Sequence, residues 1–534
     1  MHFRKKVIVT FSAVKSCGKK SLCKLAKLTN YSKSSVHRQM KTIENRSHIS
    51  GSQFFETEEG MQWLRRLVLA SVLIFGLHGN IGAGVMSSFF EAINIIAFIG
   101  LSESSVSRLK HKMMEMLQVY QSELQPALNQ SALNLNIVTG ADETFFERQM
   151  ILLFMELSSG YILLEEAATN RKASTWDKLT VTARQKFKSV LCLASDRAKS
   201  IIKFTKEAKI KSITDLFHMQ QSVVKLFRYA FASKLKTLNK SHKKAEDELS
   251  TLIKLDEKPE LIAKQEKAIK AIEHQKNTIN IGQTRYREQL KAISINTHPF
   301  DAHSNAKTAE VLSEQLNNSL HELRSIAKDC SISDGKKRLN YFENHIPDMV
   351  RLIALWWQWV EIDLKRQSCS AELIIWLKTR LLPMLYWKQQ IKKSRANQSL
   401  RDYYKNLYAQ AEKNLRNDPL TDKYLSDRWT SWAKDFVMKF QRSTSQIEGH
   451  NAILSERNHC LRGMSALHIK TDVVLNNHWI KRDDGKTATE RLFKFKPPDL
   501  LQWLDDNMPE LALPRKRRKN LKEFSPLLST ALAA

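Results

Sequence analysis

Three acidic residues occur in contexts that could support chemistry on phosphate esters. Asp142 lies in Val138-Thr-Gly-Ala-Asp-Glu-Thr-Phe-Phe146, Asp196 ends the apolar run Val190-Leu-Cys-Leu-Ala-Ser, and Glu448 lies in Ser445-Gln-Ile-Glu-Gly-His-Asn451. The first two contexts predict carboxylates at or near strand ends, and the third predicts a carboxylate on a helix. The intervals are 54 residues (196 − 142) and 252 residues (448 − 196), so we expect a compact core divided by a long insertion.

Three carboxylates on separate elements are suited to hold metal ions for phosphoryl transfer. Two ions about 3.5–4 Å apart neutralise charge on the attacking and leaving oxygens, and Mg²⁺ prefers carboxylate ligands. We expect two Mg²⁺ (or Mn²⁺) ions, with Asp142 bridging both, Asp196 holding one and Glu448 the other. Any single acidic residue is more often a solvated surface group, so the prediction depends on the three together.

Glu143 competes with Asp142 for the same role. Adjacent residues of a strand point to opposite faces, so only one of the two can serve. The residues around them do not alternate cleanly between apolar and polar, and the spacing alone therefore leaves both open.

The elements that must position these residues follow from short apolar runs. Residues 135–139, 150–157 and 161–165 predict an antiparallel meander of three strands with a tight turn at Ser158-Ser-Gly160. A helix is predicted over 171–187, a buried parallel strand over 189–194, a helix over 197–208 and a fifth strand over 213–217. The order βββαβαβ predicts an α/β core of the ribonuclease-H-like class, interrupted by a large all-α insertion and preceded by helix-turn-helix units.

The charge of the chain indicates a polyanionic partner. Lys and Arg number 85 against 55 Asp and Glu, which gives a net charge of +30. Double-stranded DNA fits better than a membrane, because the longest apolar run, Leu67–Leu77, is shorter than the roughly 20 residues that span a bilayer.

The N-terminus and the cysteines indicate where the protein is located. Arg4, Lys5 and Lys6 precede an apolar stretch too short for a signal peptide. The six scattered cysteines predict reduced thiols in a cytoplasm and form no zinc-ligand pattern.

A short motif recurs near the N-terminus. Ser32-Lys-Ser-Ser-Val-His-Arg38 is repeated as Ser102-Glu-Ser-Ser-Val-Ser-Arg108, each after an apolar stretch and before a basic one. The pattern favours two helix-turn-helix units over ordinary helical hairpins. We expect Val36, Met40 and Ile43 to pack inward in the first unit, and Phe89, Ile93 and Ile96 in the second. The predicted DNA contacts are Lys33, Ser34, His37, Arg38, Lys41, Arg108 and Lys110.

Five regions follow from these patterns. Residues 236–289 predict a coiled-coil hairpin that turns near Asp256–Pro259, and Trp356, Trp357 and Trp359 are expected in a helical core. Pro514-Arg-Lys-Arg-Arg-Lys519 is a basic cluster. The predicted regions are 1–130 (tandem helix-turn-helix), 131–225 (core, first part), 226–434 (helical insertion), 435–505 (core, last part) and 506–534 (basic tail).

The three acidic blocks resemble those of bacterial insertion-sequence transposases of the DDE type. Ser159-Gly-Tyr161 with Thr175-Trp176 is similar to a hairpin and helix of that family, and Asp215-Leu-Phe-His218 resembles a D-x-x-H motif of members with helical insertions. The resemblance covers roughly 135–220 and 435–505. It implies Asp142 over Glu143, and it implies that Asp215 and His218 lie near the active site. A histidine with a purely structural role is the alternative for His218.

Basic and polar residues around Glu448 complete the expected site. His450 and Asn451 follow Glu448 closely and are predicted to support the active site, while Arg442 and Arg462 are predicted to contact DNA; a solvated helix face is the alternative for each.

The function that follows is binding of a mobile element's terminal repeats, then metal-dependent strand cleavage and transfer into target DNA. We expect a homodimer or higher assembly on DNA in a bacterial cytoplasm, associated with the nucleoid and with no membrane. A catalytically silent DNA-binding regulator and a nuclease without joining activity are the alternatives.

Overall fold

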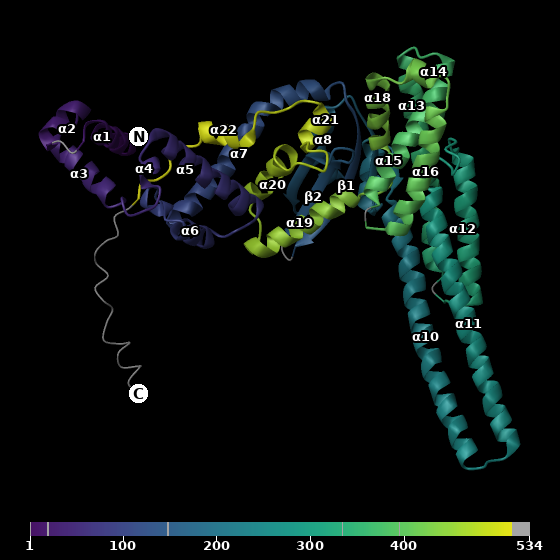
Figure 1. The fold of residues 1–534 in the computed structure, drawn as a ribbon. Coiled ribbons are helices and arrows are strands. Elements are labelled where there is room, and N and C mark those ends of the chain that lie inside the picture. Colours follow the sequence, from purple (N-terminus) through teal and green to yellow (C-terminus); the bar gives the residue numbers. More distant parts are fainter. Residues whose placement is uncertain (1, 19–20, 147–148, 334, 395, 515–534) are drawn as a thin grey trace. The chain divides into compact units, whose positions relative to one another are not determined.

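The computed structural model describes residues 2–18, 21–146, 149–333, 335–394 and 396–514. These residues are mostly helical and contain one mixed sheet of five strands (Figure 1). The chain divides into two compact units, 1–131 with 453–534, and 132–452. Residues 453–505, which the sequence grouped with the core, therefore belong to the unit that contains the N-terminus. The predicted basic cluster after Pro514 lies outside the described residues.

The first unit is helical throughout its described part. Thr57 caps α5 through a hydrogen bond from the Gly60 backbone, and α5 continues directly into the π-helical stretch η1. Its elements are α1 (His2–Cys17), α2 (Leu22–Thr29), α3 (Lys33–Glu44), α4 (Ser52–Phe55), α5 (Glu58–Ser71), η1 (Val72–His78), α6 (Ala83–Ala92), η2 (Ile95–Ala97), α7 (Glu103–Ala132), α20 (Ala466–His478), α21 (Ala488–Phe493) and α22 (Leu500–Asn507).

Helices α2 and α3 form a short helical pair. Asn30 ends α2 in a left-handed conformation, and the Ser32 hydroxyl caps α3 by accepting from the Ser35 backbone. Val36 is fully buried as expected, whereas Met40 and Ile43 are only half-buried. The polar Gln39 is buried too, because its side-chain oxygen accepts a hydrogen bond from Thr10 Oγ1 at 2.6 Å.

The second copy of the repeated motif has a different setting. Helix α7 begins at Glu103 and continues for 30 residues. Phe89 and Ile93, which we expected to pack inward, are 41% and 40% exposed, and Phe90 and Ile95 are buried instead. Helix α6 ends at Ala92 and the chain turns through a left-handed residue at position 94, so the helical spacing that would bury 89 and 93 does not continue.

One helical stretch in the first unit is longer than the apolar run suggested. Glu58–His78 is long and apolar enough, by length and composition alone, to cross a membrane. Half of its most apolar window is buried within the structure, as in the core helix of a compact domain.

The second unit contains the sheet. Its strands are β1 (Asn136–Phe146), β2 (Gln149–Glu156), β3 (Tyr161–Ala168), β4 (Ser189–Ser195) and β5 (Ser212–Thr214), with α8 (Ala173–Gln185) and α9 (Lys199–Glu207) between them. The spatial order is β3-β2-β1-β4-β5. β1, β2 and β3 pair antiparallel, whereas β4 pairs parallel with both β1 and β5. The fifth strand is shorter than predicted and ends at Thr214, because Asp215 caps the next helix.

The two faces of the sheet differ. One face buries Ala141, Leu152 and Leu193 against Trp176 of α8 and Phe204 of α9. Large apolar side chains pack together there, and the burial of their surface stabilises the packing of α8 and α9 on the sheet. Position 140, one residue before Ala141, points to the opposite face, which carries the candidate site described below.

Among the described residues, ten helical elements connect β5 to the last helix of this unit. They are α10 (Leu216–Lys254), α11 (Pro259–Asn296), α12 (Ala309–Asp329), α13 (Gly335–Arg366), α14 (Ala371–Trp376), η3 (Leu377–Leu381), α15 (Leu382–Lys393), α16 (Gln398–Arg416), α17 (Thr421–Tyr424) and α18 (Asp427–Lys439). Helices α10 and α11 run side by side as a long hairpin (Figure 1), with Pro259 in the first turn of α11. Trp356 is fully buried, Trp357 packs edge-on to Phe300, and Trp359 is half-buried. Helix α19 (Ser445–Leu461) follows, and the boundary between the two units falls within it.

Candidate active site

Parallel pairing of β1 with β4 positions Asp142 and Asp196. Gly140 is the last residue of β1 in register with β4, opposite Ala194. Asp142, two places further along β1, and Asp196, the first residue after β4, therefore lie near the same end of this strand pair. A Cβ on Gly140 would lie 2.6 Å from Ile447 Cδ1 of α19. Helix α19 therefore packs closely on the face of β1 that carries Asp142, and a larger residue at 140 would require the side chains of Ile447 and Leu157 to shift.

The structure separates Asp142 from Glu143. Asp142 Oδ2 accepts a hydrogen bond from Asn451 Nδ2 of α19 at 2.8 Å. Glu143 lies on the opposite face, where its Oε1 is 2.5 Å from Arg171 Nη1. Strand β1 continues in regular pairing through both residues, so the alternation that the sequence pattern obscured is present in the backbone. Asp142 lies within the strand, beyond the last residue that pairs with β4.

Glu448 enters the site from α19. It precedes Asn451 by three residues, which places both side chains on one face of the helix. Glu448 Oε1 lies 3.4 Å from His218 Nε2 in the first turn of α10. Apart from this ion-pair contact, the buried Oε1 atom makes no hydrogen bond among the described residues, although the Glu448 side chain as a whole is 35% exposed. β1, the end of β4, the start of α10 and α19 thus contribute to one acidic cluster.

The electrostatics of this cluster favour a cation. The pKa of Asp142 is raised to about 6, chiefly by burial. A backbone hydrogen bond from Glu143 opposes this shift, the charge of Asp196 adds to it, and His218 opposes it. The pKa of Glu448 is also raised, first by burial and then by the charge of Asp215. Converging carboxylates of this kind destabilise one another unless a positive charge is present. Asp142, Asp196 and Glu448 are the oxygen ligands that Mg²⁺ or Mn²⁺ prefers, so the donor set fits a divalent ion.

Asp215 has a different role from these three residues. Ligand atoms of Asp215, His218 and Glu448 lie within 4.8 Å of one another. However, Asp215 Oδ1 accepts from the Phe217 backbone, and Oδ2 accepts from both the backbone and the hydroxyl of Thr444. Its own backbone N–H donates to Ser195 O. This fully buried carboxylate therefore caps α10 and fixes the segment that leads into α19, and little of its capacity remains for a metal.

Two predicted site residues bind elsewhere. His450 Nε2 lies 2.5 Å from Glu165 Oε2, and both side chains are buried, so this pair ties α19 to β3. Arg442 donates to Ser294 O and Thr297 Oγ1 at the end of α11. A cation at the C-terminal end of a helix is favourable because it compensates unpaired carbonyl groups. Neither residue reaches the acidic cluster through these contacts.

The residues predicted to contact DNA lie mainly in the first unit. Lys33, Ser34, His37, Arg38 and Lys41 are all exposed and lie on one side of α3. Arg108 is exposed, but Lys110 is half-buried and donates to Ile81 O at 2.8 Å. Arg462 is exposed just after α19, in a left-handed conformation. The second repeat thus presents fewer free cations than the first.

Several residues that hold the site together were not foreseen from the sequence. Arg171, Thr444 and Glu165 each partner a residue that sequence reasoning singled out, across separations of 28, 229 and 285 residues. No local sequence pattern predicts partners so far apart in the chain. The alternation of strand residues could have shown only that Glu143 and Asp142 lie on opposite faces of β1.

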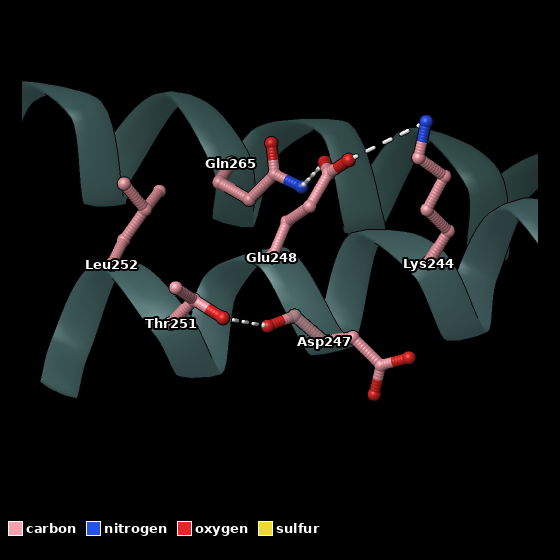
Figure 2. Close-up of a pocket in the computed structure, with 6 residues that line it drawn as sticks. All are labelled: Lys244, Asp247, Glu248, Thr251, Leu252 and Gln265. Carbon is pink, nitrogen blue, oxygen red and sulfur yellow. Dashed lines mark hydrogen bonds and ion pairs between the residues drawn. The ribbon is translucent and has the colours of Figure 1, made fainter.

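A shallow pocket on the α10–α11 hairpin is a different kind of feature. Figure 2 shows Gln265 donating to Glu248, and Glu248 paired with Lys244 one turn earlier. The lining comprises Lys244, Asp247, Glu248, Thr251, Leu252 and Gln265. The charged groups that pair here, Lys244 and Glu248, are exposed and lie one turn apart on α10. The lining residues are typical of a solvated helix surface and include no converging catalytic groups.

Comparison with known proteins gives one family. Residues 377–520 match a family of unknown function, DUF6399. The matched stretch covers less than half of the chain; it includes Glu448 and Asn451 and excludes Asp142 and Asp196. No curated protein matches the chain.

Proposed function

We propose that this protein is a DDE-type transposase that binds the ends of its own mobile element and catalyses metal-dependent cleavage and transfer of DNA strands. One observation carries the proposal. Asp142 and Asp196 come from adjacent parallel strands, and Glu448 approaches the same face on a helix whose Asn451 bonds Asp142. Carboxylates that three separate elements bring to one face of a sheet are the arrangement that metal-dependent phosphoryl transfer needs.

The architecture supports the proposal. The element order β1-β2-β3-α8-β4-α9-β5 is the order expected for a ribonuclease-H-like core, and the sheet mixes antiparallel and parallel pairs. In such a sheet the reactive groups are expected where the parallel strands end. Asp196 directly follows β4, and Asp215 directly follows β5. The helical insertion between β5 and α19 accounts for the long interval before the third acid.

Each residue of the site has a definite task under this proposal. Asp142, Asp196 and Glu448 would hold two divalent ions, which lower the charge of a scissile phosphate and of its leaving oxygen. Asn451 donates to one carboxylate oxygen of Asp142 and so fixes the direction of that side chain. His218 stands beside Glu448 and limits the repulsion between the acids. Asp215 keeps α19 in position through Thr444.

The charge distribution is consistent with DNA as the substrate. The exposed side of α3 carries Lys33, His37, Arg38 and Lys41, and the net charge of the chain is +30. Basic side chains on one side of a short helix favour binding in the major groove, because they contact phosphates while the helix reaches base edges. Joining two element ends requires two active sites, so we expect two copies on paired DNA.

The proposal is tested by strand cleavage on DNA that flanks the gene of this protein. The natural chain, Asp196→Asn and the exposed neighbour Glu207→Gln are each incubated with Mg²⁺ or Mn²⁺ and labelled DNA. Nicking at fixed positions and joined products are expected for the natural chain and Glu207→Gln only. Site-specific binding without cleavage in every protein would instead support a silent regulator. Cleavage without joined products would support a nuclease, and absence of both binding and cleavage would contradict the proposal.

A further inference from the structure

A buried carboxylate of the insertion touches the loops that carry the acids. Asp348 of α13 is 3% exposed. Its Oδ2 forms an ion pair with Arg197 Nη1 and accepts from Thr214 Oγ1 at 3.4 Å, and its Oδ1 accepts from Arg351 Nη1 at 2.8 Å. Arg197 directly follows Asp196, and Thr214 directly precedes Asp215. One side chain from a helix more than 130 residues away therefore joins the ends of β4 and β5.

The backbone after Asp196 needs such support. Arg197 has a φ of 64°, a left-handed conformation that is strained for a residue other than glycine. Its N–H donates to Ser195 Oγ at 3.1 Å, and the next N–H, that of Ala198, donates to Asp196 Oδ1 at 2.8 Å. The direction of the Asp196 carboxylate thus depends on the same turn that the Arg197–Asp348 ion pair holds.

The contact extends to the edge of the sheet. β5 is an edge strand, and Arg351 of α13 donates to Ser212 O in it at 3.1 Å. Helix α13 therefore covers an otherwise open edge, and Asp348 compensates the two arginines that would lie there unpaired. A buried carboxylate with three partners is costly to disturb, since removal of its charge leaves two cations beside it.

We propose that Asp348 is a positioning residue for Asp196, and that the helical insertion, through α13, orients a ligand of the metal site. This inference rests on the proposed function. Without the carboxylate at 348, the Arg197 guanidinium loses its partner and becomes free to pair with Asp196. Such a pair would occupy the carboxylate that the metal needs. The backbone at Arg197 could also leave its left-handed conformation, which would change the direction of the Asp196 side chain.

The test measures metal binding apart from catalysis. Binding isotherms for Mn²⁺ are recorded on the full-length protein for the natural chain, Asp348→Asn and Glu343→Gln. Glu343 is the matched control, because it lies on the same helix and forms an exposed ion pair with Arg324. We expect Asp348→Asn to weaken Mn²⁺ binding roughly tenfold, as loss of a group that orients a ligand does, and we expect Glu343→Gln to leave it unchanged. The Mn²⁺ concentration for half-maximal nicking should shift in parallel.

A second variant separates positioning from folding. Arg197→Gly removes the competing cation and adopts the left-handed turn without strain. The double variant Arg197→Gly with Asp348→Asn should therefore recover most of the Mn²⁺ affinity lost in Asp348→Asn alone, which a general loss of packing would not allow.

Each outcome decides the inference. Equal Mn²⁺ affinity in Asp348→Asn and the natural chain would overturn it, as would a double variant no better than Asp348→Asn. If the natural chain binds Mn²⁺ but cuts no DNA, the proposed function fails while the positioning role is still judged from the isotherms.

Discussion

Two regions of the second unit bury polar groups in opposite ways. In the acidic cluster, Glu448 Oε1 is buried with no hydrogen-bond partner among the described residues, and burial raises the pKa of Asp142. In the helical insertion, buried His298 has both ring nitrogens within hydrogen-bond distance of tyrosine hydroxyls, Tyr386 at 2.5 Å and Tyr404 at 2.9 Å. A carboxylate oxygen that makes no hydrogen bond costs stability, so the contrast supports the functional role proposed for the first region, whereas the second region satisfies its polar groups.

The largest expected effect comes from removing charge in the acidic cluster. Asp142→Asn should lower the rate of strand cleavage by at least about a thousandfold, which corresponds to ~4 kcal/mol in the barrier. The melting temperature should stay the same or rise, because a repelled carboxylate is lost. Cleavage rates and thermal melting of one preparation check both. Glu143→Gln, one residue away on the other face, is the control, and an equal loss of cleavage there would remove the distinction between the two faces.

In the insertion the same kind of change should act on stability. His298→Leu leaves the hydroxyls of Tyr386 and Tyr404 buried without a partner, so unfolding of this region should become easier by about 3 kcal/mol. Urea unfolding followed by tryptophan fluorescence measures this. Adding Tyr386→Phe and Tyr404→Phe to His298→Leu should recover most of the loss, because no polar group then remains unsatisfied. If the triple variant is no more stable than the single one, packing and not hydrogen bonding explains the effect.

Asp215 lies between the two regions and should affect both properties. Asp215→Ala removes a helix cap and the bonds to Thr444, which should cost about 2 kcal/mol of stability and also reduce cleavage, since α19 carries Glu448. Denaturant midpoints and cleavage rates are compared with Asp499→Ala. Asp499 caps α22 in the other unit and contributes nothing to the acidic cluster. A variant at 215 that loses stability but cleaves at the natural rate would contradict the positioning role of Asp215.

The smallest effect is a dependence of stability on pH in the insertion. Burial holds the pKa of His298 well below its usual value, so between about pH 6.5 and the folded pKa only the unfolded chain takes up a proton. Stability from this group is therefore constant above pH 6.5 and falls below it, by up to ~1.4 kcal/mol per pH unit. Urea midpoints from pH 7.5 to 5 should fall more steeply for the natural chain than for His298→Leu. Parallel curves would show that His298 is charged or solvated when folded.

Local sequence patterns determined much of the secondary structure. The apolar runs at 150–157, 161–165 and 189–194 are strands, the segment 171–187 is helical, and the hairpin turns between Lys254 and Pro259 where the composition indicated. Periodicity works here because each segment has a single apolar face, or is apolar throughout, and Pro and Gly interrupt the runs. It failed at Phe89 and Ile93, because an almost continuous apolar stretch does not indicate which side of the helix is buried. It also failed at the end of β5, because the carboxylate of Asp215 caps a helix that begins earlier than predicted.

The sequence by itself also singled out Asp196, Glu448 and one of Asp142 and Glu143 as candidate metal ligands, because their types and contexts limit what chemistry they could perform. Only the tertiary structure decided that Asp142 and not Glu143 faces α19, that His450 binds Glu165 on β3, and that Asp215 is committed to Thr444. Only the fold brings Asp348 to Arg197. The physical reason is the same in each case: a side chain's partner is set by packing between segments far apart in the chain, and periodicity within one segment carries no information about the other.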